Sequence, residues 1–143
     1  MSNAKSKAPT PHIPTALIDL LESDALGHLA TIRANGTPHV TPLWVDHDGE
    51  AVLVNVRLDR VKAANMRERP EVAISIVDPR NPYRYLAITG RVVSWSEDGW
   101  REHMNKLARR YMRVERYPWF FPGEQRAIFR IVATHVYYEM GDA

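Results

Sequence analysis

The sequence predicts a mainly β fold of the α+β class, with six or seven antiparallel strands and about three flanking helices. The dipeptides Asn35-Gly36 and Asp48-Gly49 separate apolar runs, as they do in tight hairpins. The other apolar runs are short and rich in β-branched residues, which favours buried strands. Since most neighbouring strands are joined by short turns, we expect a mainly antiparallel sheet that closes into a small barrel.

The length of 143 residues is enough for one domain with a real core and too short for two. Hydrophobic residues make up 45% of the chain and charged residues 25%, the usual balance of a globular domain. We assign residues 13–143 to a single domain and residues 1–12 to a mobile tail. Within that tail, residues 1–4 are interpreted as an expression scar, and the rest is rich in Pro, Lys and Ser.

The composition argues against several classes of protein. Without cysteine, the chain has no disulfide, no thiolate nucleophile and no thiolate metal site, which fits a reducing cytoplasm. No apolar run is long enough to span a membrane, and the N-terminus lacks the apolar stretch of a secretory signal. The net charge of +2 is too small to indicate nucleic-acid binding. We therefore expect a cytoplasmic protein that binds neither membranes nor nucleic acid.

The first half of the chain is expected to hold two helices and three strands. A short helix begins at Pro14, whose fixed φ suits a first helical turn, and leucines and isoleucine of residues 17–21 form its apolar stripe. The two turns place strands at about 26–34, 38–47 and 50–57. A second helix over 60–69 is ended by Pro70.

The second half is expected to alternate strands and loops around one longer helix. Residues 72–77 form a buried strand, and residues 78–82 form a loop because two prolines cannot join a ladder. A strand over 85–95 bends or bulges at Gly90. Ser96 is expected to be the N-cap of a helix that runs to about Arg113. An aromatic loop (117–123) precedes the last strands, at 127–133 and 135–139.

A cluster of cations follows the third strand, at Arg57, Arg60 and Lys62. Arg60 and Lys62 stand where the strand passes into a helix, and a helix N-terminus offers free N–H donors to an anion. The arginine fork and the lysine ammonium both suit phosphate. The alternative is a solvated helix face with no ligand.

The strand 39–45 is unusual because Pro42 removes one donor from its ladder. Something other than a neighbouring strand can therefore lie alongside it, for example a flat ring, to which Thr41 offers a hydroxyl. The alternative is an ordinary edge bulge in which Trp44 is a core or interface residue.

No motif in the chain indicates a metal site or a catalytic side chain. The histidines lack the spacing of metal ligands, and no carboxylates form a convincing acid–base pair. The glycine motifs of dinucleotide-binding folds and hydrolases are absent. The aromatic loop is too apolar to be covered easily within a small monomer. Such patches commonly mark a partner surface or a ligand lid, and we interpret this one as evidence for a dimer.

Several segments together resemble the split β-barrel flavin-binding superfamily typified by pyridoxamine phosphate oxidase, and most closely its deazaflavin-dependent oxidoreductases. The resemblance spans residues 14–139 and rests on the order and spacing of its pieces. The matching pieces are Gly27-His-Leu-Ala-Thr-Ile32, Gly36-Thr-Pro-His-Val-Thr-Pro42, Val52-Leu-Val54, Arg60-Val-Lys-Ala-Ala-Asn65 with Arg69-Pro70, Asn81-Pro-Tyr-Arg-Tyr85 and Gly90-Arg91.

The resemblance implies an FMN-binding split-barrel fold and a homodimer with two equivalent cofactor sites between the protomers. The residues that it assigns to the cofactor are the phosphate-binding pair Arg60 and Lys62, the ring-lining residues His39, Thr41, Pro42 and Leu43, and the strand end Val54, Asn55 and Arg57. Relatives often carry a second arginine where this chain has Ala64, and Arg57 or Arg67 is expected to compensate.

The activity that the resemblance implies is hydride transfer to or from a small organic substrate, with the deazaflavin coenzyme F-420 as cofactor. An FMN-dependent oxidoreductase of the same fold is the first alternative, and a non-catalytic flavin or haem binder is the second. Since the cofactor would carry the chemistry, no catalytic side chain is expected. Lys62 is expected to face solvent, so that its replacement by alanine leaves the fold intact.

Overall fold

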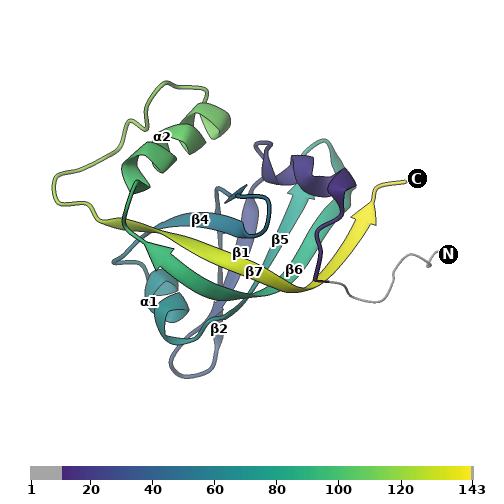
Figure 1. Ribbon diagram of the computed structural model, residues 1–143, viewed down its shortest axis with the longest axis horizontal. Coiled ribbons are helices and arrows are strands. Elements are labelled where there is room, and N and C mark those ends of the chain that lie inside the picture. Colours follow the sequence, from purple (N-terminus) through teal and green to yellow (C-terminus); the bar gives the residue numbers. More distant parts are fainter. Residues whose placement is uncertain (1–10, 143) are drawn as a thin grey trace.

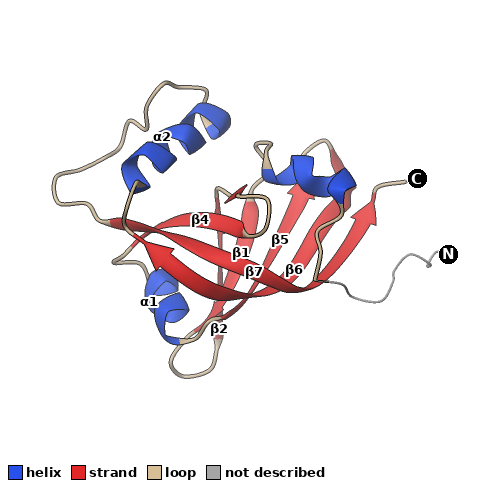
Figure 2. Ribbon diagram, viewed as in Figure 1, coloured by secondary structure: helices blue, strands red, loops and turns tan. Residues whose placement is uncertain are grey.

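Seven antiparallel strands form one curled sheet in the computed structural model, which describes residues 11–142 (Figures 1 and 2). The strands pair in the order β2-β1-β5-β6-β7-β4-β3. Their bounds are β1 (Gly27–Ile32), β2 (Pro38–Leu43), β3 (Asp46–His47), β4 (Val52–Arg57), β5 (Glu71–Asp78), β6 (Asn81–Ser96) and β7 (Arg126–Met140). The expected tail at residues 1–12 falls outside the described residues except for Pro11 and His12.

Three helices flank the sheet, as the sequence predicts. They are the 3₁₀ helix η2 (Thr15–Leu21), α1 (Val61–Glu68) and α2 (Trp100–Tyr111). In Figure 1, α2 lies over one end of β4 and β7, and α1 lies on the other side of these strands. None of the helices within residues 11–142 has the length and apolar character needed to cross a membrane.

The predicted mainly β split-barrel fold is confirmed, but the backbone ladder does not close the barrel. The sheet curls into a half-barrel whose edge strands are β2 and β3. Its concave side encloses one apolar core, in which Leu17 of η2, Leu29 of β1 and Phe129 of β7 are fully buried. Fully burying one such side chain contributes about 1.5–3 kcal/mol, so this core dominates the stability of the fold.

The bend expected at Gly90 is present in β6, where the pairing with β7 shifts register between Thr89 and Gly90. A Cβ atom at Gly90 would come within 2.8 Å of both Ile131 Cγ2 and the Val132 carbonyl oxygen. Only glycine therefore lets the two longest strands approach at this point. Thr134 lies in the same bulge, and its hydroxyl donates to the Thr89 carbonyl.

The strand expected at 38–47 is two strands, because the chain crosses from one edge of the sheet to the other. β2 pairs with β1, whereas β3 pairs with β4. The break falls at Trp44 and Val45, and the Val45 N–H bonds to the hydroxyl of Tyr111 on α2 instead of to a strand. The Asn35-Gly36 and Asp48-Gly49 hairpins both form. In each turn the glycine has a positive φ, 89° at Gly36 and 96° at Gly49, whereas Asn35 and Asp48 do not.

Three further boundaries differ from the prediction. The loop expected at 78–82 is only two residues long, and Pro82 lies in β6 at a bulge, where it needs no partner on β5. Ser96 is not the N-cap of α2: Gly99 takes that position with φ 75°, and Ser96 Oγ accepts from the Asp98 N–H instead. The two strands expected at the C-terminus are the single strand β7, which continues through its bulge.

Candidate functional site

A cavity of about 360 Å³ opens between edge strand β2, strand β4, the start of α1, helix α2 and the aromatic loop. This volume lies within the range of small-molecule sites. The residues that line it are His39, Thr41, Leu43, Trp44, Asn55, Val56, Arg57, Arg60, Val61, Lys62, Met104, Leu107, Tyr117, Trp119 and Arg126.

Most of the site residues predicted from the sequence line this one cavity, namely His39, Thr41, Leu43, Asn55, Arg57, Arg60 and Lys62. Pro42 and Val54 do not. Side chains alternate between the two faces of a strand, so Pro42 points away from the face that carries Thr41 and Leu43. Val54 is fully buried in the core of the half-barrel.

Lys62 is half-buried in the cavity, so the expectation that it faces solvent is wrong. Its ammonium group donates a 2.8 Å hydrogen bond to Thr41 Oγ1 across the gap between α1 and β2. Burial lowers the pKa of Lys62 below its ordinary 10.5, and the positive charges of Arg60 and Arg126 lower it further. A buried cation that lies near other cations favours an anion as its partner.

Arg60 is the N-cap residue of α1 and holds an extended backbone conformation there. Its side chain is exposed at the mouth of the cavity and forms no ion pair or hydrogen bond with any residue of the described chain. Lys62 likewise has no carboxylate partner within residues 11–142. The two residues therefore offer two positive charges that are in direct ion-pair contact with no carboxylate of the described residues.

The other two cations of the cavity are held by carboxylates. Arg57 binds Asp59 with both Nε (3.0 Å) and Nη2 (2.9 Å), and its guanidinium lies 5.0 Å from the Phe121 ring centre. Arg126 Nε binds Glu124 at 2.7 Å. Arg67, the other residue expected to compensate for Ala64, does not line the cavity. The positive charge available to a ligand is thus centred on Arg60 and Lys62.

The aromatic loop forms a wall of the cavity. Trp44 stacks on Tyr111 with 5.1 Å between the ring centres, and it packs edge-to-face against Tyr117 with 5.9 Å between the ring centres. The Tyr117 N–H bonds to Asn105 Oδ1 at 2.8 Å, which fixes the start of the loop to α2. Trp119, which also lines the cavity, is 64% exposed. The apolar composition of the loop is the only feature of the sequence that indicates this wall. No feature of the sequence indicates that Arg126 or the α2 residues Met104 and Leu107 line the cavity.

Two buried polar atoms of the cavity residues lack a hydrogen-bond partner among the described residues, namely His39 Nδ1 and Asn55 Oδ1. Burial lowers the pKa of His39 below 6.5, and the charges of Arg33 and Lys62 add to this effect, so His39 is neutral at pH 7. Buried polar atoms nearly always have partners. Their presence beside uncompensated cations and apolar walls fits a ligand that combines an anionic group, an apolar ring and polar edges.

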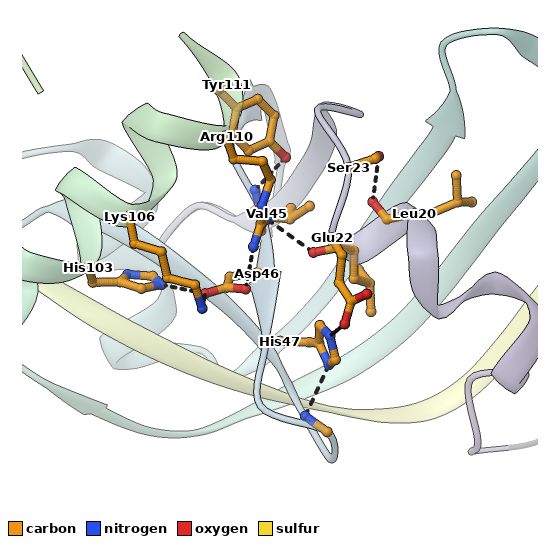
Figure 3. A network of polar contacts seen from close by, with 12 residues as sticks. Leu20, Glu22, Ser23, Val45, Asp46, His47, His103, Lys106, Arg110 and Tyr111 are labelled. Atoms are coloured by element: carbon orange, nitrogen blue, oxygen red, sulfur yellow. Dashed lines mark hydrogen bonds and ion pairs between the residues drawn. The ribbon is translucent and has the colours of Figure 1, made fainter. Parts of the chain in front are cut away.

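A buried ion-pair network lies next to the cavity and joins β3 to α2 (Figure 3). Asp46 is only 2% exposed and accepts hydrogen bonds from His103 (3.0 Å), Lys106 (2.9 Å) and Arg110 (2.9 Å). Burial alone would raise the pKa of Asp46, but these hydrogen bonds hold it far below its ordinary value. The carboxylate is therefore ionised at all moderate pH values and fixes the helix against the sheet.

The described part of the chain, residues 11–142, contains no group of three or more His, Cys, Asp or Glu side chains arranged to hold a metal ion. The chemistry of the cavity rests instead on two cations, two unpartnered polar atoms and an aromatic wall. Such a site can bind and orient an anionic ring compound.

Comparison with known proteins gives one family and one fold. The sequence pattern described as pyridoxamine 5'-phosphate oxidase matches residues 13–139. A solved structure named F-420 reductase is 35% identical to this chain. The match covers 87% of this chain and 98% of the reductase chain, with a TM-score of 0.75. No curated protein sequence shows a significant match.

More distant structures share the fold alone. General stress protein 26 from Bacillus anthracis str. Sterne is 19% identical, with coverages of 87% and 91% and a TM-score of 0.63. The haem storage protein HutZ from Vibrio cholerae is 15% identical, with coverages of 85% and 90% and a TM-score of 0.61. Proteins that are named for different roles thus share this fold.

Proposed function

Because the chain belongs to the pyridoxamine 5'-phosphate oxidase family, we propose that its cavity binds the deazaflavin coenzyme F-420 and that the protein is an oxidoreductase acting on a small organic substrate. The relative named F-420 reductase, 35% identical, supports the choice of coenzyme. The observation that carries the proposal is the half-buried Lys62, which together with Arg60 has no carboxylate partner among residues 11–142.

Each part of the cavity has a task in this proposal. Arg60 and Lys62 bind the phosphate of the coenzyme, because a charge-assisted hydrogen bond to phosphate is about twice as strong as a neutral one. Thr41 orients the Lys62 ammonium. Leu43 and Trp44 cover the apolar ring and exclude water. When bound, the coenzyme supplies the hydride chemistry at its central ring.

An FMN-dependent oxidoreductase is the second candidate, and one observation favours it. Asp59 already holds Arg57, and Ala64 adds no charge to the basic helix, so the uncompensated charge matches one phosphate better than a longer polyanionic tail. F-420 stays the first choice because the structure named F-420 reductase is 35% identical in sequence to this chain.

Titration of the purified protein with F-420 and with FMN tests the choice of cofactor. Trp44 and Trp119 line the cavity, so binding should quench tryptophan fluorescence. Saturable binding of F-420, with weaker binding of FMN, is expected. Binding of FMN alone would replace the first candidate by the second.

A turnover assay separates an oxidoreductase from a non-catalytic carrier of flavin or haem. The reduced coenzyme is mixed with the protein and an electron acceptor, and its absorbance is followed. An oxidoreductase consumes the reduced coenzyme over many turnovers. Saturable binding without consumption would identify a carrier.

We also propose that the protein is a homodimer in the cytoplasm, with cofactor sites between the protomers. The exposed apolar side chains support a partner surface: Trp119 (64% exposed) and Phe121 (42%) in the aromatic loop, and Val40 (62%) on the outer side of edge strand β2. Sedimentation equilibrium is expected to give twice the mass of the chain. A monomer at micromolar concentration would contradict the dimer.

A further inference from the structure

The amide of Asn55, on β4 at the cavity wall, can have only one orientation. Its Nδ2 lies 3.0 Å from the Trp100 carbonyl oxygen and 3.1 Å from His103 Nδ1. A carbonyl oxygen only accepts hydrogen bonds, so the amide atom that faces Trp100 must be the NH₂ group. Asn55 Oδ1 is therefore turned away from α2, and it is buried without a partner among the described residues.

His103 uses the second hydrogen of the same amide. Its Nε2 lies 3.0 Å from Asp46 Oδ2, and a carboxylate oxygen accepts, so Nε2 carries the hydrogen. In the neutral ring Nδ1 is then an acceptor, and it receives the other N–H of Asn55. Both donors of the Asn55 amide are engaged by α2, and only its acceptor is left.

At the far end of this chain of contacts, several further hydrogen bonds hold Asp46 (Figure 3). Asp46 also accepts from Lys106 and Arg110, and Arg110 Nη1 donates to the Val45 carbonyl at 2.7 Å. The carboxylate therefore cannot turn away from His103 without breaking several buried contacts. The orientation of the histidine ring follows from that of Asp46.

We propose that His103, held by Asp46, is a positioning residue that fixes the Asn55 amide so that Oδ1 accepts a hydrogen bond from a hydroxyl or ring N–H of the ligand. This inference rests on the proposed function, since it assumes a flavin-type ligand in the cavity. The inference also predicts specificity for ligands that present a hydrogen-bond donor to Asn55 Oδ1. A ligand that presents an acceptor there would leave two buried acceptors facing each other and would bind more weakly.

Two variants of His103 separate positioning from simple packing. His103→Leu removes both ring nitrogens and leaves the Asn55 amide free to turn, whereas His103→Gln retains one acceptor and one donor. The dissociation constant of the cofactor, FMN or F-420, is expected to rise about tenfold in His103→Leu and to return within about threefold in His103→Gln. Arg109→Ala, at an exposed position of α2 whose side chain bonds to the Glu115 carbonyl and to neither Asp46 nor Asn55, is the matched control and should bind as the unchanged protein does.

A second set of titrations identifies the ligand group. Asn55→Leu is titrated with the cofactor and with its ring system bearing a methyl group in place of the hydroxylated chain. Loss of affinity for the cofactor only assigns the contact to a chain hydroxyl, and loss for both assigns it to a ring N–H. Unchanged affinity for both would overturn the inference.

Nitrogen NMR of the unliganded protein tests the orientation without any variant. The His103 ring is expected as the neutral tautomer with hydrogen on Nε2. A ring with hydrogen on Nδ1 would overturn the inference even if His103→Leu failed to fold. If the unchanged protein bound neither cofactor, the proposed function would fail and the inference with it, whereas cofactor binding with unaffected His103 and Asn55 variants would refute the inference alone.

Discussion

Lys62 at the start of α1 and Thr41 on edge strand β2 are joined by a 2.8 Å hydrogen bond across the open side of the half-barrel. The contact connects two segments that share no backbone ladder. It holds the lysine ammonium at the cavity while leaving its remaining hydrogens free for a ligand, because an ammonium group has three donors.

Replacing Lys62 by alanine should weaken cofactor binding by about 1.5–3 kcal/mol, the value of a hydrogen bond to a charged group. This corresponds to a dissociation constant about 10- to 150-fold higher in a fluorescence titration. Arg67→Ala removes the same charge from the same helix outside the cavity and serves as the control. Equal effects of the two substitutions would mean that only net charge matters.

Cofactor affinity should fall at alkaline pH, because Lys62 must be protonated to bind an anion. Its pKa in the free protein is lowered by burial, so the loss begins at a lower pH than for an exposed lysine. In Lys62→Arg the fall should move to higher pH, since the guanidinium stays charged. Titrations between pH 7 and pH 10 measure this, and superimposable profiles would exclude Lys62 as the titrating group.

Asp59→Asn should strengthen the binding of an anionic cofactor, about two- to fivefold, because it releases Arg57 from its carboxylate partner. The gain should be larger for F-420 than for FMN, since F-420 carries more negative charge. Glu68→Gln removes a carboxylate at the other end of α1 and should change neither affinity. A gain that is equal in the two variants would point to a general charge effect.

Asp46→Asn should lower the free energy of unfolding at pH 7 by about 3–5 kcal/mol, because it removes the buried carboxylate that pairs with the cations Lys106 and Arg110. Both Asp46 and Asp48 have a lowered pKa, that of Asp48 about 2. Their contribution is therefore complete above the unfolded-state value of about 4 and is lost as the pH falls toward the folded-state values.

Urea denaturation at a series of pH values tests this linkage. The unchanged protein should lose stability from about pH 5 to pH 2, and Asp46→Asn should show a shallower decline. Asp98→Asn, at an exposed carboxylate before α2, is the control and should follow the unchanged protein. The same slope in Asp46→Asn would show that Asp46 does not take part in acid unfolding.

Gly90→Ala should destabilise the protein by about 1–3 kcal/mol, because the added methyl group would overlap Ile131 and the Val132 backbone. Ser94→Ala on the same strand, at an exposed position, should have little effect. Thermal unfolding measures both. A neutral Gly90→Ala would show that the β6–β7 bulge adjusts without cost.

The sequence predicts the parts of this molecule that depend on local patterns. The turns at Gly36 and Gly49, the apolar runs and the cations at Arg60 and Lys62 all lie within short stretches of chain, and each is close to its predicted place. The bend at Gly90 is equally local, because glycine inside an apolar strand indicates close backbone approach.

The rest of the site depends on contacts between distant segments. Arg126 reaches the cavity because β7 pairs with β4, where it stands opposite Arg57, and no local pattern reveals that pairing. The partners of Asn55 and Asp46 on α2 are also far along the chain. The division of 38–47 into β2 and β3 follows from the position of α2, whose Tyr111 takes the Val45 N–H.

The pairing of β4 with β7 also has a consequence for the order of folding. The strand that carries Asn55 and Arg57 lies far along the chain from the strand that it pairs with. Because such a pairing closes a long loop before its contacts stabilise it, we expect this wall of the cavity to form late in folding, after the local hairpins.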